Sequence, residues 1–257
     1  MGGESFFRPL TRFGYALLAI GAAVLAWKLA VVVFAPAPFL LPPPERVAAT
    51  AWNRAGYLLG HAGTTLAEML LGLAFGSVAG VTVALAMAQS KFVARVMLPF
   101  VVTTQTLPVF AIAPLIVIWF GYGMPSKVVM ASLIIFFPVA SAFLDGLTNV
   151  RREWLDLAAG WGAGRYVRLL KIQAPAALPS LATGLKLAAS LAPIGAVVGE
   201  WAGASAGLGY VMLQANARSQ TDLVFACLVL LALMALALRA AMAAVVDRLV
   251  FWQSHIE

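Results

Sequence analysis

The chain of 257 residues is 63% hydrophobic and only 11% charged, with a mean hydropathy of +0.95. Soluble domains carry about 25% charged residues, so this composition excludes a soluble globular class and predicts an all-α integral membrane protein. The net charge of +7 would suit a nucleic-acid partner, but arginines and lysines in short loops beside apolar segments are explained by membrane topology, and no nucleic acid is expected to bind.

Apolar runs of about 20 residues have the length needed to cross a hydrocarbon core of about 30 Å, at about 1.5 Å per residue. We expect six transmembrane helices within a single domain covering residues 1–257, at 15–34, 66–87, 97–120, 128–147, 178–199 and 223–246. Arg8 and Arg12 precede the first run, as in a signal peptide, but that run is long enough to span a membrane. We therefore expect it to be retained.

Basic residues fall mostly on one side of the six expected spans when residues 1–14 are placed in the cytoplasm. On that side lie Arg8, Arg12, Lys91, Arg95, Arg151, Arg152, Arg165, Arg168, Lys171 and Arg248. On the opposite side lie Arg46, Arg54, Lys127 and Arg218. Because arginine and lysine are concentrated in cytoplasmic loops, this bias predicts that both termini are cytoplasmic.

The third expected span, 97–120, has polar side chains and three prolines at membrane depth. Prolines free backbone carbonyls, and a broken helix is tolerated within a bilayer only where it faces protein or a water-filled cavity. The amide of Gln105 can hydrogen-bond an uncharged heterocycle, and the ring of Phe110 or Trp119 can stack on one. We take Gln105, Thr106, Phe110 and Trp119 as candidate residues of a substrate path, with the packing of a kinked helix as the alternative.

Ionisable side chains occur within or beside the apolar runs at Glu68, Asp145, Lys186 and Glu200. A charge at the bilayer centre costs about 2.5–3.5 kcal/mol on insertion scales, so these groups are expected to face the protein interior, an aqueous path or the headgroups. Glu200 is a further candidate for the substrate path, although the neighbouring Trp201 also suits the outer membrane interface.

The histidines, the single cysteine and one pair of glycines also bear on what the chain can form. His61 and His255 have no Asp, Glu or Cys at the sequence spacing typical of metal ligands, and the single Cys227 lies in an apolar run. No metal site and no disulfide is therefore expected. Gly72 and Gly76 form a G-x-x-x-G spacing, which predicts close helix packing within the subunit or across a dimer interface.

The segment between the fourth and fifth runs, residues 149–177, is basic and helix-patterned, unlike the rest of the chain. Asp156 suits the positive end of a helix, and the glycines of GWGAG allow a sharp turn before a second short helix. On that helix Arg165, Arg168 and Lys171 recur every three residues and form a basic stripe. The residues alone favour equally a rigid knuckle that docks on a soluble partner and a solvated loop that holds topology.

This segment resembles the EAA loop of permease subunits of binding-protein-dependent ABC importers, where Glu-Ala-Ala is followed by a Gly-Ala pair and then by a hydrophobic residue and Leu-Pro. The matching positions are Asp156 for the Glu, Ala158 for the second Ala, Gly162 and Ala163 for the pair, and Ala174 and Pro175 for Leu-Pro. The sequence departs from the pattern in having Asp for Glu and Ala for Leu. The resemblance extends over nearly the whole chain.

The resemblance implies the type I importer fold, also called the MetI-like fold, in the cytoplasmic (inner) membrane of a bacterium. It implies that the loop forms coupling helices in a groove of an ATPase subunit, through Asp156, Ala158, Gly162, Ala163 and Arg165. No G-x-x-x-x-G-K-[ST] occurs in the chain. We therefore expect no cofactor and no enzyme activity here, with ATP and Mg²⁺ used by the partner. The other implied partners are a second ATPase subunit, an extracytoplasmic binding protein and a second permease copy, as a homodimer.

Three segments, QTLPVFAIAPL, LAPIGAVVGEWAGASAGLGY and LQANARSQTDLVFA, are most similar to permeases for hydroxymethylpyrimidine, a thiamine precursor. The resemblance thus implies translocation of a thiamine-related pyrimidine, with an alkanesulfonate, taurine or nitrate as alternative cargo of the same branch. The third span has no arginine, which disfavours a bare anion. An ion-coupled carrier acting alone is the competing class, and the chain has no convincing internal repeat in its support.

Overall fold

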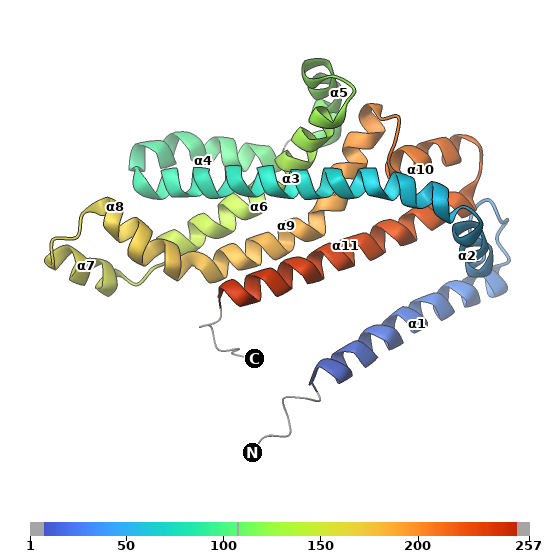
Figure 1. The fold of residues 1–257 in the computed structure, drawn as a ribbon, viewed down its shortest axis with the longest axis horizontal. Coiled ribbons are helices and arrows are strands. Elements are labelled where there is room, and N and C mark those ends of the chain that lie inside the picture. Colours follow the sequence, from blue (N-terminus) through green and yellow to red (C-terminus); the bar gives the residue numbers. More distant parts are fainter. Residues whose placement is uncertain (1–7, 107, 251–257) are drawn as a thin grey trace. The chain divides into compact units, whose positions relative to one another are not determined.

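A computed structural model describes residues 8–106 and 108–250, and the regular elements within these ranges are helices (Figure 1). The chain divides into two compact units, Met1–Leu58 with Met212–Leu228, and Leu59–Val211 with Val229–Glu257. The α-helices are α1 (Arg8–Phe34), α2 (Pro44–Asn53), α3 (Ala55–Gln89), α4 (Lys91–Thr106), α5 (Val109–Phe120), α6 (Met124–Thr148), α7 (Arg152–Gly160), α8 (Arg165–Arg168), α9 (Ala174–Gly203), α10 (Leu208–Ala217) and α11 (Thr221–Leu249).

The all-α membrane architecture predicted from the sequence is confirmed. Four described helices are long and apolar enough to cross a bilayer, namely α3, α6, the continuous stretch Arg165–Gly203 and α11. The bent pair of α4 and α5 would make a fifth span. The first expected span falls in α1, where the described apolar stretch Leu18–Phe34 is shorter. The six expected runs therefore correspond to these four helices, the bent pair and α1.

The first unit consists of α1, α2 and residues 212–228, which end α10 and begin α11. A hydrogen-bonded ion pair joins Lys28 of α1 to Glu45 of α2. That hydrogen bond holds the pKa of the exposed Glu45 carboxyl below its usual value of 4.5. The hydroxyl of Thr50 donates to the carboxylate of Asp222 at 2.7 Å. Polar contacts therefore link α2 to both of its neighbours in this unit.

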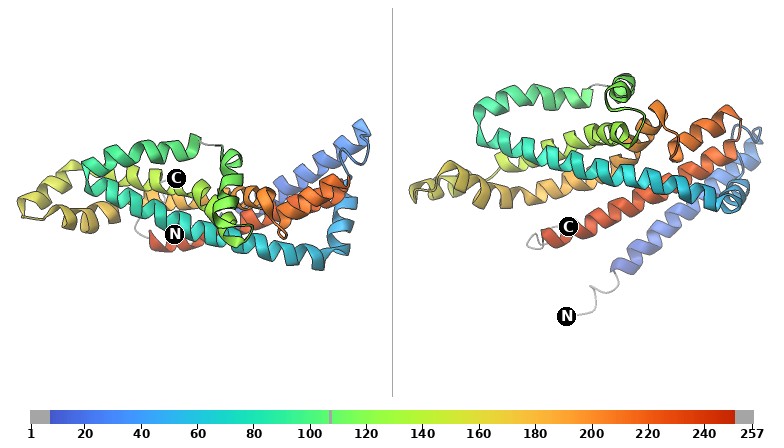
Figure 2. Two further views of the ribbon diagram at one scale, coloured as in Figure 1. Left: turned by 90° about the horizontal axis from the view of Figure 1, so that it is seen from above. Right: turned by 45° about the horizontal axis from the view of Figure 1, so that its top comes forward.

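In the second unit α6 lies between α3 and α9, and glycines on both neighbours let the backbones approach closely (Figure 2). A Cβ atom added to Gly76 of α3 would lie 2.8 Å from the backbone oxygen of Ser132. One added to Gly195 of α9 would lie 2.6 Å from the Cα atom of Ala131. The close packing predicted at Gly72 and Gly76 is thus found within the subunit, between α3 and α6.

The core of this unit is built from small side chains on α9 facing larger ones on α3, α6 and α11. Its buried members are Met69, Leu73, Ile135, Val139, Ala188, Ala189, Ala192, Ala196 and Leu238. Lipid tails are as apolar as leucine, so helices in a bilayer associate through close packing of this kind. The alanine-rich face of α9 is what allows it to lie against α6.

The third expected span, 97–120, is not one continuous helix. α4 and α5 are bent by 105° relative to each other where they meet. Pro108 precedes α5 in an extended conformation, with φ of −68° and ψ of 107°. Because proline has no amide hydrogen and disfavours helical geometry in the residue before it, the first helix ends at Thr106 and the second begins at Val109.

The second helix expected in the 149–177 segment is not a separate short helix. α8 continues through a π-helical segment, Leu169–Gln173, into α9, so that Arg165–Gly203 is one stretch of 39 residues. Pro175 lies just after the π-helical segment and cannot donate to the carbonyl one turn before it. A π-turn changes the register of the helical hydrogen bonds at that point, and the helix continues past the proline.

Candidate functional site

The knuckle, which we define as residues 152–168, is a helix-turn-helix at one end of the second unit (Figure 1). Gly162 turns the chain after α7 with a φ of +76°, which L-residues rarely adopt. Its N–H donates to the carbonyl of Ala159 at 2.9 Å, and the N–H of Ala163 donates to that of Ala158 at 2.9 Å. These bonds form a Schellman cap. The Gly-Ala pair is therefore a helix terminator that sets the angle of the knuckle.

The outer surface of the knuckle is unusually rich in exposed aromatic side chains. No residue of α7 is buried. Trp161 is 83% exposed and Tyr166 is 65% exposed, and Trp154 is exposed as well. Asp156 and Arg165 are also exposed, so the charged residues expected to make contact are accessible. Exposed apolar side chains rimmed by charges mark contact surfaces for another protein.

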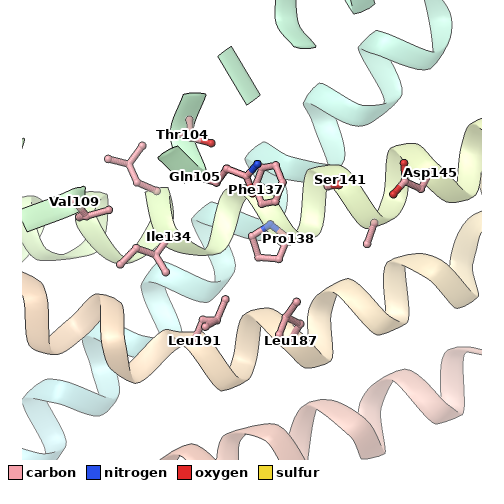
Figure 3. Close-up of a pocket in the computed structure, with 12 residues that line it drawn as sticks. Thr104, Gln105, Val109, Ile134, Phe137, Pro138, Ser141, Asp145, Leu187 and Leu191 are labelled. Atoms are coloured by element: carbon pink, nitrogen blue, oxygen red, sulfur yellow. The ribbon is translucent and has the colours of Figure 1, made fainter. Parts of the chain in front are cut away.

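A cavity of about 430 Å³ lies between α4, α5, α6 and α9. Its polar groups are those of Thr104 and Gln105 on α4 and those of Ser141 and Asp145 on α6, while leucines of α9 form the opposite wall. Figure 3 shows Gln105 beside the ring of Phe137. The cavity is therefore mostly apolar with a few convergent polar groups, which is the usual make-up of a small-molecule site.

Three of these polar side chains are available to a ligand. Within the described ranges, Gln105, Ser141 and Asp145 have no side-chain hydrogen bond and no ion pair. Thr104, in contrast, donates its hydroxyl hydrogen to the carbonyl of Val101 at 2.7 Å. A ligand in the cavity would meet an amide, a hydroxyl and a carboxylate that are not engaged elsewhere in the described chain.

The other substrate-path candidates are placed outside this cavity. Thr106 is exposed and donates to a carbonyl one turn back in α4 at 3.0 Å. Phe110 is 57% exposed and its ring centroid lies 6.1 Å from that of Trp201. Trp119 is 70% exposed near the end of α5. The structure brings Gln105 alone, of the residues predicted from the sequence, to the cavity wall.

Glu200 is 1% exposed and lies in a buried hydrogen-bonded cluster. Its carboxylate accepts hydrogen bonds from the hydroxyl of Thr65 at 2.6 Å and from the backbone N–H groups of Gly209 and, at 3.3 Å, Tyr210. Thr65 in turn accepts from the N–H of Leu208 at 2.8 Å. The carboxylate therefore binds the first amides of α10, where a negative charge is most favourable.

Two glycines allow the backbone to wrap around this carboxylate. Gly207 has a φ of +111°, and a Cβ atom on it would overlap the Glu200 carboxylate. A Cβ atom on Gly209 would lie 2.7 Å from a Glu200 oxygen. The N–H of Gly207 donates to Nδ1 of His61 at 3.0 Å. The GLG sequence at 207–209 is thus tied to both α3 and α9, which gives Glu200 a positioning role.

A second buried pair joins α3 to α6. Glu68 is 0% exposed and Lys127 is 5% exposed, and the Lys127 Nζ lies 3.3 Å from a carboxylate oxygen of Glu68. Of the three environments expected for Glu68, the structure shows the protein interior, whereas Lys127 was expected outside the spans. Each member of the pair offsets part of the cost of burying the other, since an unpaired buried charge is expensive. The glutamate in the middle of an apolar run was the sequence signal for a buried polar contact at this position.

Comparison with known protein families decides the class of this chain. The family described as "Binding-protein-dependent transport system inner membrane component" matches residues 72–251. The chain belongs to this family. It is a membrane-spanning permease subunit of an ABC importer. The sequence resemblance is therefore confirmed at the level of the family, its multi-pass membrane location and its fold.

Two relatives show how similar other members are. A "Probable ABC transporter permease protein" of Haemophilus influenzae is 47% identical over 86% of this chain and 91% of its own length. The "Formylaminopyrimidine transport permease protein ThiX" of Halalkalibacterium halodurans is 38% identical over 77% and 79%. Other relatives, 28% to 33% identical, are named for transport of riboflavin, taurine and aliphatic sulfonates. The names of these relatives therefore span several cargo classes.

A solved structure confirms the fold independently of the sequence. A chain of "Inward facing conformations of the MetNI methionine ABC transporter" aligns with a TM-score of 0.66 over 75% of this permease and 96% of that chain. The two are 19% identical, so the likeness concerns the fold. The fold of this chain is therefore that of a MetI-like permease.

Proposed function

We propose that this permease translocates a thiamine-related pyrimidine that an extracytoplasmic binding protein delivers. The observation that carries the proposal is the cavity, where the Gln105 amide lies beside the Phe137 ring. An amide pairs well with the ring nitrogens and amino group of a pyrimidine, and an aromatic ring stacks on it. The 38% identity to the formylaminopyrimidine permease supports the same cargo class.

The charges around the cavity support a pyrimidine over the alternatives of an alkanesulfonate, taurine or nitrate. Anion sites recruit fixed positive charge, and none of the residues that line this cavity is basic. Two lysines at membrane depth are committed elsewhere. Lys186 pairs with Asp247 at 2.7 Å, and Lys127 pairs with Glu68 at 3.3 Å.

The knuckle is proposed to transmit the energy of ATP hydrolysis to the spans. Two copies of this chain would each dock a knuckle in a groove of one of two ATPase subunits, which bind ATP and Mg²⁺. The contact residues would be Asp156, Ala158, Gly162, Ala163 and Arg165. Because α8 is continuous with α9, and α9 supplies one wall of the cavity, a displacement of the knuckle would move that wall as a lever.

The proposed transport cycle is the one that membership of the ABC importer family implies. ATP binding would close the ATPase dimer, draw the two knuckles together and open the cavity to the outside, where the binding protein releases its ligand. Hydrolysis would return the cavity to the inside. The cycle requires ATP, whereas an ion-coupled carrier acting alone would not.

The test is uptake of labelled hydroxymethylpyrimidine into vesicles that contain this permease with its ATPase and its binding protein. We expect saturable, ATP-dependent uptake that neither taurine nor an alkanesulfonate inhibits. Uptake of the sulfonates in its place would overturn the pyrimidine assignment. Uptake driven by an ion gradient without ATP would overturn the coupling scheme.

A further inference from the structure

We infer that Asp145 makes this cavity selective for cargo that is uncharged or positively charged and rich in N–H donors, so that anions are rejected. This inference rests on the proposed translocation path. It deepens that proposal by assigning a charge preference to a residue that touches the cargo.

The acceptor groups of the cavity lie along one face of α6. Ser141 and Asp145 are four residues apart on this helix, which separates them by about 6 Å along its axis. Figure 3 shows both of them, with Pro138, on the side of α6 that lines the cavity. Pro138 has no amide hydrogen, so the carbonyl of Ile134, another lining residue, lacks its helical donor. The carboxylate and the hydroxyl therefore lie on the same face of α6 as the residue whose carbonyl is freed by Pro138.

The helix itself gives no reason for a carboxylate at this position. α6 ends at Thr148, so Asp145 lies in its last turn. The negative end of the helix dipole is there, and an acidic side chain is unfavourable in that turn. In addition, the Asp145 side chain is exposed and forms no ion pair within the described chain. Local stability would favour a neutral or basic residue, which points to a role toward a ligand.

The electrostatics of the cavity follow from this single charge. None of the twelve lining residues is Lys, Arg or His, so the Asp145 carboxylate is not compensated within the cavity wall. A sulfonate or nitrate passing Ser141 would approach an uncompensated like charge. An aminopyrimidine would instead present N–H groups to a row of acceptors, and a protonated ring would gain further from the carboxylate.

Charged thiol reagents test the field of Asp145 without any knowledge of the cargo. Ser141→Cys would be introduced into a Cys227→Ser background of the assembled transporter. The rates at which a cationic and an anionic methanethiosulfonate modify the new thiol would then be compared. At about 6 Å in a water-like dielectric, the carboxylate speeds modification by the cationic reagent about three-fold and slows modification by the anionic reagent about three-fold. We expect Asp145→Asn to lower the ratio of the two rates about ten-fold. A ratio that is the same in both backgrounds refutes the inference.

Uptake measurements test the consequence for transport. With saturating loaded binding protein, Asp145→Asn is expected to lower pyrimidine uptake per ATP hydrolysed about ten-fold, while Asp145→Glu retains most of it. The control Glu45→Gln removes one negative charge from an exposed position of α2 that does not line the cavity, and it should keep normal uptake. If the wild type takes up pyrimidine and Asp145→Asn takes it up equally well, the inference about Asp145 is refuted and the proposed function stands. If the wild type transports no pyrimidine, the proposed function fails, and the reagent ratio still decides the role of Asp145.

Discussion

Replacement of Glu200 by glutamine is the most informative perturbation of the buried cluster. The side chain keeps its size, but one acceptor oxygen becomes an NH₂ donor that faces the donors from Thr65, Gly209 and Tyr210. An unsatisfied buried donor costs about 1–3 kcal/mol. We therefore expect Glu200→Gln to lower the free energy of unfolding by about 1–3 kcal/mol.

Thermal unfolding of the solubilised permease would measure this loss. For a chain of this size about 2–4 °C of Tm corresponds to 1 kcal/mol, so the expected decrease is about 2–12 °C. Hydrogen exchange should report the same change locally, because the amides of Gly209 and Tyr210 lose their acceptor. The exposed Glu45→Gln is the matched control, and its Tm near neutral pH should stay within about 2 °C of the wild type, because an exposed ion pair stabilises little.

The alternative role of Glu200 makes the opposite set of predictions. A carboxylate that bound cargo directly would leave Tm and amide exchange unchanged when substituted, and would raise KM for uptake. That outcome would refute the positioning role derived from the hydrogen bonds. Thr65→Val provides a second check, because it removes one donor to the carboxylate and should cost about 1–3 kcal/mol.

Three further predictions address the knuckle, the helix packing and the first unit. Gly162→Ala forces an L-residue to a φ of +76°, which costs about 1–2 kcal/mol. ATP hydrolysis by the assembled transporter should continue while uptake per ATP falls. The control Gly160→Ala should leave both hydrolysis and uptake unchanged. Gly76→Leu should prevent folding or lower Tm, because its Cβ would lie 2.8 Å from a backbone oxygen of α6. The control Gly63→Leu places its side chain in open space and should leave Tm nearly unchanged in the same melting assay. Because the pKa of Glu45 is held below 4.5, its ion pair with Lys28 stabilises the fold above that pH, and this stabilisation is lost as the pH falls below it. Glu45→Gln should therefore flatten the acid limb of a plot of Tm against pH. An unchanged limb would contradict the pairing.

The positions of individual side chains were less predictable than the helices that carry them. Gln105 was expected in a substrate path, and the structure places it in the cavity wall. Phe110 and Trp119 were expected there as well, but the 105° bend between α4 and α5 carries both of them away. Pro108 was visible in the sequence, yet the direction of the bend depends on how α5 packs on α6 and α9.

Lys127 and Asp145 show the same limit for charges. A lysine just before an apolar run suits a solvent-exposed loop, and only the approach of α3 to α6 reveals that Lys127 meets Glu68. Asp145 was one ionisable residue among several in the sequence. Its importance depends on the other residues that surround it in the cavity, and these come from three further helices.

The sequence by itself determined the membrane class, the helical segments and the knuckle, because these depend on local quantities: hydropathy over a bilayer thickness, the missing amide hydrogen of proline and the conformational freedom of Gly162. Only the tertiary structure decided which charges pair and which face a cavity. Those outcomes depend on contacts between residues far apart in the chain, and the glycine and alanine surfaces that bring α3, α6 and α9 together set the distances on which every such contact depends.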